Sequence, residues 1–141
     1  MDRLVVSCGH LDPLHHGHIE HFRQAKALGD KLIVIIGNDQ QIIRKYGYVL
    51  QPVHERVARL MRKAPFIDGV IVSIDRDNTQ CETLRMLRPF MFVKGGDRNE
   101  NNTPEAQVCR EIGCHVFYGA GDKLGSTGVM RQRIERLAGV R

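Results

Sequence analysis

Two histidines, His15 and His18, flank Gly17 at the point where a loop is expected to become a helix. The first turn of a helix has unpaired N–H groups and the positive end of the helix dipole, and both attract anions. Imidazoles three residues apart can point to the same side and donate hydrogen bonds to one polyphosphate. Gly17 lets the backbone approach the anion closely because it has no side chain. This segment therefore predicts a phosphate-binding site.

Other interpretations of the same segment remain open. Five histidines lie between residues 10 and 21, and such a cluster could bind zinc, although no Cys or Glu completes an evident ligand set. His10, His16 and His21 could equally be surface residues, and Asp12 could cap a turn.

Three further glycine-bearing segments are each expected to follow a strand. They are Gly37-Asn38-Asp39, Lys94-Gly95-Gly96-Asp97 and residues 119–128. Ligands of open parallel sheets bind beyond the carboxyl ends of the strands, near the topological switch point. We therefore expect these segments to converge with the histidine loop on one edge of a sheet.

Apolar runs alternate with amphipathic stretches along the whole chain. Strands are expected at 4–6, 31–37, 69–74, 90–93 and 114–118. Helices are expected at 18–28, 55–62, 79–87, 104–112 and 128–138, with a short helix through Ile42 and Ile43. This order predicts one α/β domain over residues 1–141, a three-layer Rossmann-like sandwich with a five-stranded parallel sheet.

The composition is that of an ordinary globular domain, with 42% hydrophobic and 26% charged residues among 141. The longest strongly apolar run, Leu32–Ile36, is too short to span a membrane, so we expect no membrane contact. The four cysteines have no CxxC spacing, which favours reduced, mostly buried thiols in a cytoplasmic protein.

The formal charge of +5 comes mainly from arginine, which supplies 15 of the 21 basic residues. Arginine suits phosphate and carboxylate oxygens, although composition bias explains the count equally well. A basic domain could bind nucleic acid, but no cluster of Lys and Arg is interleaved with aromatic residues. We therefore expect small phosphorylated ligands and no nucleic acid.

The ten residues from Gly9 to His18 read Gly-x-x-Asp-x-x-His-x-Gly-His, and this pattern resembles the signature of the cytidylyltransferase-like nucleotidyltransferases. His15-His16-Gly17-His18 matches the HxGH motif of that family. Further resemblances lie at Arg44-Lys45, Pro52–Arg56 and Ser126-Thr127. Val93-Lys94-Gly95-Gly96-Asp97 is most similar to the branch that adenylylates heptose 1-phosphate.

The resemblance implies transfer of a nucleotidyl group from an NTP to a phosphate monoester, with release of pyrophosphate. ATP and heptose 1-phosphate are the first expectation, with Mg²⁺ bound mainly through the phosphates of the NTP. The alternatives are a glycerol-3-phosphate cytidylyltransferase using CTP, an FMN adenylyltransferase, or a nucleotide-binding regulatory module without turnover. Family members often form dimers, so a homodimer is also possible.

The same resemblance implies roles for individual residues. The catalytic residues would be His15, His18 and Lys45. The nucleotide would contact His10, Leu11, His15, His18, Lys94, Gly95, Asp97, Ser126 and Thr127. The acceptor would contact Asp12, Asp39, Lys45 and Arg56. A turn, a helix cap or a surface ion pair would be the plain structural alternative for several of these residues.

Three features depart from the family's usual pattern. The family has a small residue where His10 stands, a further Thr where Gly128 stands, and a proline-rich run in place of residues 46–51. These differences leave the acceptor open more than the reaction. We also expect residues 44–51 to be mobile without ligand and to close over the bound NTP, with Lys45 reaching the phosphates.

Overall fold

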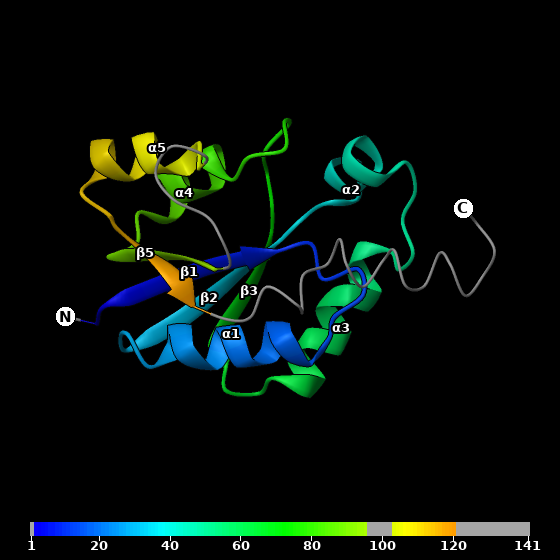
Figure 1. Ribbon diagram of the computed structural model, residues 1–141, viewed down its shortest axis with the longest axis horizontal. Helices are drawn as coiled ribbons and strands as arrows, with labels where there is room; N and C mark the ends of the chain where they lie inside the picture. Colours follow the sequence, from blue (N-terminus) through cyan, green and yellow to red (C-terminus); the bar gives the residue numbers. More distant parts are fainter. Residues whose placement is uncertain (1, 96–102, 121–141) are drawn as a thin grey trace.

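The computed structural model describes residues 2–95 and 103–120 and contains a five-stranded sheet (Figure 1). The strands are β1 (Leu4–Gly9), β2 (Lys31–Ile36), β3 (Gly69–Val72), β4 (Met91–Gly95) and β5 (His115–Ala120). Their order in the sheet is β3-β2-β1-β4-β5, and every neighbouring pair is parallel. The α/β fold with a five-stranded parallel sheet that the sequence predicted is confirmed.

Helices cover both faces of this sheet and so complete three layers. Helices α1 (His16–Lys26) and α3 (Val53–Lys63) lie below the sheet in Figure 1, and α4 (Cys81–Leu87) and α5 (Glu105–Ile112) lie above it. The remaining helix, α2 (Asp39–Tyr46), stands beyond the carboxyl end of β2 rather than on a face. It is therefore placed to border a ligand site.

The core divides into two clusters because successive side chains of a strand point to opposite faces. Val5 packs with Phe22 of α1 and Leu60 of α3, whereas its neighbour Val6 packs with Leu84 of α4 and Val108 of α5. All of these side chains are buried. Strands that are covered on both faces have continuous apolar sequences, and these runs are the pattern from which the strands were predicted.

The strand order reverses next to β1. The chain proceeds from β1 to β2 and β3 on one side and then crosses to β4 and β5 on the other side. In open α/β sheets a crevice forms at this switch point, outside the carboxyl ends of the two strands. The residues at the ends of β1 and β4 are therefore the first place to look for a site.

Several element boundaries differ from those predicted, and three of the differences affect the site. Helix α1 begins at His16, so His18 lies inside its first turn. Helix α2 continues to Tyr46, so Lys45 belongs to a helix and not to the following loop. Strand β4 continues to Gly95, so Lys94 lies in the strand. The expected helix at 128–138 lies outside the described residues, as do Asp97, Ser126 and Thr127.

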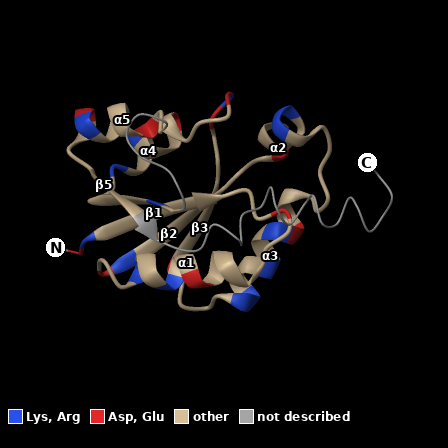
Figure 2. Cartoon of the chain, in the orientation of Figure 1, with Lys and Arg blue, Asp and Glu red and all other residues tan. Residues whose placement is uncertain are grey.

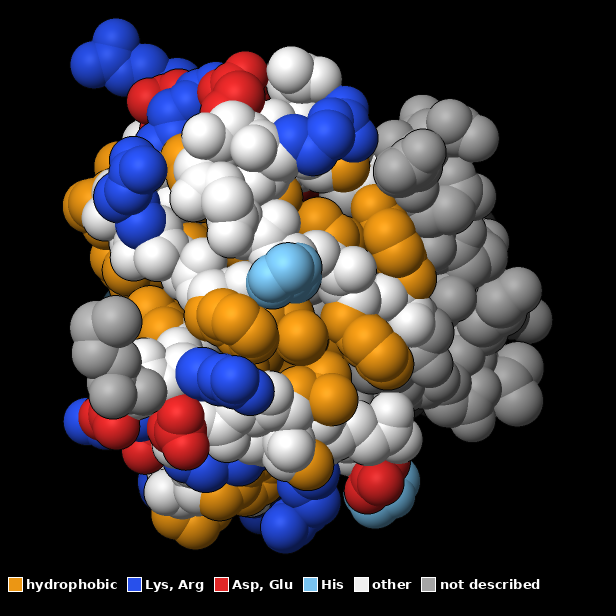
Figure 3. All heavy atoms as spheres, turned by 90° about the vertical axis from the view of Figure 1, so that its left-hand side faces the viewer, with side chains coloured by type: hydrophobic (Ala, Val, Ile, Leu, Met, Phe, Trp, Pro, Cys, Tyr) orange, Lys and Arg blue, Asp and Glu red, His pale blue; other side chains and the backbone are white. Residues whose placement is uncertain are grey.

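Charged side chains lie mostly on the helices and loops, and the centre of the sheet carries few of them (Figure 2). Within the described ranges, every helix is too short or too polar to cross a membrane. The face at the left of Figure 1 shows hydrophobic side chains gathered around a histidine (Figure 3). Exposed large apolar residues of the molecule include Met86 and Phe117. The homodimer implied by the resemblance stays a prediction.

Candidate active site

His15 and His18 are joined by reciprocal hydrogen bonds at the start of α1. His15 is the N-cap residue, and its Nδ1 accepts from the backbone N–H of Gly17 at 3.0 Å. Nδ1 of His18 accepts from the backbone N–H of His15 at 3.3 Å. The two rings stack with their centroids 3.8 Å apart. The pair therefore points to one side of the helix, as the spacing in the sequence suggested.

These hydrogen bonds also fix the proton of each ring. A neutral imidazole carries its proton on one nitrogen only, and here Nδ1 of both rings is an acceptor. The proton therefore sits on Nε2 of His15 and of His18. Nε2 of His15 has no hydrogen-bond partner among the described residues. The helix start thus presents N–H donors that need no rearrangement to meet a phosphate oxygen.

Burial keeps this pair neutral. The pKa of His18 is lowered to about 3, mainly by burial and to a smaller extent by the neighbouring His15, His21 and His10. Burial also lowers the pKa of His15, with a smaller contribution from His16. At neutral pH the site therefore offers neutral donors beside the helix dipole rather than two imidazolium ions.

The depressed pKa of His18 predicts a loss of stability in mild acid. The unfolded chain protonates His18 below pH 6.5, whereas the folded chain resists protonation until about pH 3. Stability is therefore fully present above pH 6.5 and falls with pH, by about 2 kcal/mol between pH 7 and pH 5 for this one group. Urea unfolding at both pH values should show this loss in the wild type, and His18→Ala should lack it. If His18→Ala loses as much stability between pH 7 and pH 5 as the wild type does, the loss does not come from the depressed pKa of His18.

Arg56 is a buried hub that joins three loops at the same edge of the sheet. Its guanidinium donates to the carbonyl oxygens of His10 at 2.7 Å and Gly37 at 2.6 Å, and its Nε donates to that of Gln51 at 2.9 Å. It also forms an ion pair with Asp39 at 2.7 Å. The side chain of Arg56 is fully buried. It braces the site in this structure, and a contact with the acceptor would have to displace one of these partners.

Asp12 fixes the loop that follows α2. Its two carboxylate oxygens accept from the backbone N–H groups of Leu50 at 2.8 Å and Gln51 at 2.7 Å, and its side chain is fully buried. Because this side chain is fully buried, the contact with the acceptor that we expected would require the loop around Asp12 to open. The loop expected to be mobile is therefore anchored at its carboxyl-terminal end by the signature loop itself.

His10, the unusual residue of the signature, fits because its neighbour across the sheet is a glycine. A Cβ atom on Gly37 would lie only 2.3 Å from Nδ1 of His10, so no other residue type fits at position 37 without displacing the ring. The edge of the His10 ring also meets Tyr46 at the end of α2. Leu11 follows with a positive φ of 56° and a buried side chain, and so turns the chain toward α1.

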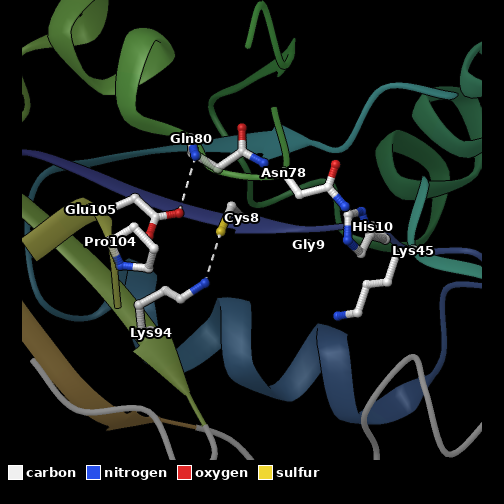
Figure 4. A pocket seen from close by; sticks show the side chains of 9 residues that line it. All are labelled: Cys8, Gly9, His10, Lys45, Asn78, Gln80, Lys94, Pro104 and Glu105. Atoms are coloured by element: carbon white, nitrogen blue, oxygen red, sulfur yellow. Dashed lines mark hydrogen bonds between the residues drawn. The ribbon is translucent and has the colours of Figure 1, made fainter. Parts of the chain in front are cut away.

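A cavity of about 420 Å³ lies at the switch point between β1 and β4 (Figure 4). Its basic residues are His10, Lys45 and Lys94. Its other polar residues are Asn78, Gln80 and Glu105, and Cys8, Gly9 and Pro104 complete the wall. Figure 4 shows Lys94, Gln80 and Glu105 on one side and His10 and Lys45 on the other. Nζ of Lys94 lies 3.5 Å from Sγ of Cys8.

The structure thus brings His10, Lys45 and Lys94 around one cavity and places Leu11, His15 and His18 in the adjoining loop and helix start. Gly95 ends β4 beside them. Sequence reasoning missed Cys8, Asn78, Gln80 and Glu105. Gln80 and Glu105 begin helices that follow the carboxyl ends of β3 and β4. That position was the available signal, because the same rule located Lys94.

Within residues 2–95 and 103–120, no group of three or more His, Cys, Asp or Glu side chains is placed to hold a metal ion. His15 and His18 accept hydrogen bonds from the backbone, and their rings stack on one another. The described geometry is that of an α/β domain with a cavity at its switch point, lined in part by basic side chains and adjoining the start of α1.

Comparison with known proteins identifies the family. The sequence pattern described as cytidylyltransferase-like matches residues 6–117. The chain is 34% identical over 116 residues to the bifunctional protein HldE of Koribacter versatilis, a match covering 82% of this chain and 24% of that protein. It is 33% identical over 138 residues to the protein of the same name from Shewanella amazonensis, covering 96% of this chain and 28% of that protein.

A solved structure has the same fold at lower identity. The lipopolysaccharide core biosynthesis protein of Thermoplasma volcanium superposes with a TM-score of 0.70 at 22% identity, over 87% of this chain and all of that one. The chain spans about a quarter of the length of the curated relatives it matches. It belongs to the cytidylyltransferase-like family of nucleotidyltransferases.

Proposed function

We propose that this chain transfers the adenylyl group of ATP to the phosphate of a sugar phosphate, with heptose 1-phosphate as the first candidate. The neutral pair of His15 and His18, beside a cavity that holds two lysines, is the observation on which the proposal rests. The segment Val93–Asp97 and the similarity to proteins named HldE both support heptose 1-phosphate as the acceptor.

The chemistry requires the site to hold two polyanions together. A phosphate monoester is mostly ionised near neutral pH, since its second pKa is roughly 6, so it needs no strong general base. One of its oxygens attacks the α-phosphorus of ATP and forms a new P–O bond. The bond to the bridging oxygen breaks, and pyrophosphate leaves with the electron pair. Transfer then depends on positioning and on stabilising the developing charge.

The described residues fit these tasks. N–H donors of His15 and His18 would meet the phosphates of ATP at the start of α1, where they are already oriented. Lys45 and Lys94 approach the cavity from opposite sides and would neutralise the charge that the two substrates bring (Figure 4). Arg56 and Asp12 would hold the loops at the correct spacing without contacting either substrate.

Mg²⁺ would enter with the nucleotide. When bound, it would neutralise charge on the triphosphate, held mainly by phosphate oxygens and water. The donor set fits this arrangement, because the described side chains that face the cavity are mainly basic or neutral, and Glu105 is the one carboxylate among them. The protein's own contribution is the set of N–H and ammonium donors.

A panel of nucleotides and acceptors tests the proposal. Pyrophosphate release should be measured for ATP and CTP, each with heptose 1-phosphate, glycerol 3-phosphate and FMN. We expect kcat/KM for ATP with heptose 1-phosphate to exceed every other pair by at least tenfold. A preference for CTP with glycerol 3-phosphate would overturn the proposed substrates, and stabilisation by ATP without pyrophosphate release from any pair would indicate a binding module.

A further inference from the structure

Glu105 is a buried carboxylate that faces the cavity. Glu105 is only 5% exposed. Its Oε1 accepts from the backbone N–H of Gln80 at 3.1 Å, and within the described part of the chain it forms no ion pair. Lys94 lines the same cavity, but its Nζ contacts Cys8 instead. A buried carboxylate is costly unless several donors reach it, so Glu105 retains capacity for hydrogen bonds from a ligand.

Gln80 is a second buried residue whose side-chain oxygen can accept a hydrogen bond from a ligand. It is 6% exposed and lines the same cavity. Among the residues that the structure describes, its Oε1 has no hydrogen-bond partner. Buried side-chain oxygens are nearly always paired in native proteins, so an unpaired one beside a cavity points to a missing ligand. Glu105 and Gln80 thus form an acceptor-rich wall of two residues.

The chemistry of this wall selects the part of a ligand that it can bind. A phosphate would be repelled by the carboxylate of Glu105, so it belongs nearer to His10 and Lys45, which lie on the other side of the cavity (Figure 4). A quaternary ammonium group would be expected to need aromatic faces, and no Trp, Tyr or Phe lines the cavity in the described part of the chain. Hydroxyl groups fit, because each can donate to a carboxylate or amide oxygen.

We propose that Glu105 and Gln80 bind hydroxyl groups of the acceptor and thereby determine that the acceptor is a polyol phosphate. This inference rests on the proposed function. The cavity would orient the acceptor by its own polarity, with the phosphate toward His10 and Lys45 and the hydroxyl groups toward Glu105 and Gln80.

The test compares an acceptor that carries hydroxyl groups with one that lacks them. In Glu105→Gln one oxygen still accepts from Gln80, but the other becomes an NH₂ group, which cannot accept from a hydroxyl. We expect kcat/KM for heptose 1-phosphate to fall at least tenfold, with kcat/KM for methyl phosphate and KM for ATP within twofold of wild type. Gln80→Met, which keeps the backbone N–H, should show a smaller loss of the same kind. Glu111→Gln, on the exposed side of α5, is the matched control.

Three results would overturn the inference while leaving the proposed function intact. They are an equal loss for both acceptors, a raised KM for ATP alone, and a preference of the wild type for phosphocholine over heptose 1-phosphate. If the wild type releases no pyrophosphate at all, the proposed function fails instead. Calorimetric binding of heptose 1-phosphate to the wild type and to Glu105→Gln then decides the inference, since weaker binding in the variant supports it and equal binding contradicts it.

Discussion

Replacing His18 by alanine is expected to lower kcat at least a hundredfold at pH 7. The Nε2–H of His18 is a pre-oriented donor because its Nδ1 is held by the backbone of His15. Removing one such donor to a developing charge costs roughly a hundredfold to a thousandfold in rate. Steady-state pyrophosphate release with saturating ATP and acceptor measures the effect.

His16→Ala is the matched control, since His16 lies in the same motif but is exposed. It should retain kcat within a few-fold of wild type. The thermal midpoint of His18→Ala should fall by only a few degrees, because the fold loses a single capping bond. Unchanged turnover in His18→Ala with an intact fold would remove His18 from the catalytic site.

Replacing Arg56 by methionine is expected to have the largest effect on stability. The change leaves the carbonyl oxygens of His10, Gly37 and Gln51 without their donor in a buried position. Loss of one partner from such a network typically costs about 3–5 kcal/mol. For a domain of this size the thermal midpoint should fall by about 10–17 °C. Calorimetric melting measures the change.

Arg62→Met tests whether this effect is specific, because Arg62 is exposed on the same helix. It should shift the thermal midpoint by no more than a degree or two. The shift of the thermal midpoint in Arg56→Lys should lie between those of Arg56→Met and Arg62→Met, since an ammonium group can replace some of the hydrogen bonds but not all. If Arg56→Met has the same thermal midpoint as the wild type, Arg56 does not hold these loops together.

The alternation of strands and helices was predictable from the sequence because each strand is covered on both faces. Val5 and Val6 both face a core, so the strand reads as an uninterrupted apolar run. The end of α2 was harder to predict from the sequence. Arg44 and Lys45 suggested a loop, but α2 runs through them to a left-handed cap at Gly47. Charge composition does not show where such a helix ends.

The places of His15, His18 and Lys94 at one edge of the sheet were also predictable, since motif spacing and the carboxyl ends of strands located them. The partners of buried polar groups were not. Asp12 bonds to residues 50 and 51, and Arg56 reaches His10, so each contact spans about forty positions in the sequence. Glu105 looks like an ordinary acidic residue in the first turn of a helix, and only burial reveals that it faces a cavity.

The most direct test of nucleotidyl transfer is to identify the products by ³¹P NMR. The wild-type protein should be incubated with ATP, Mg²⁺ and heptose 1-phosphate, and the spectrum followed until ATP is consumed. Attack at the α-phosphorus predicts pyrophosphate and an ADP-linked sugar in equal amounts. Formation of ADP together with a sugar bisphosphate, or of ADP and inorganic phosphate, would place the attack at the γ-phosphorus and contradict the account.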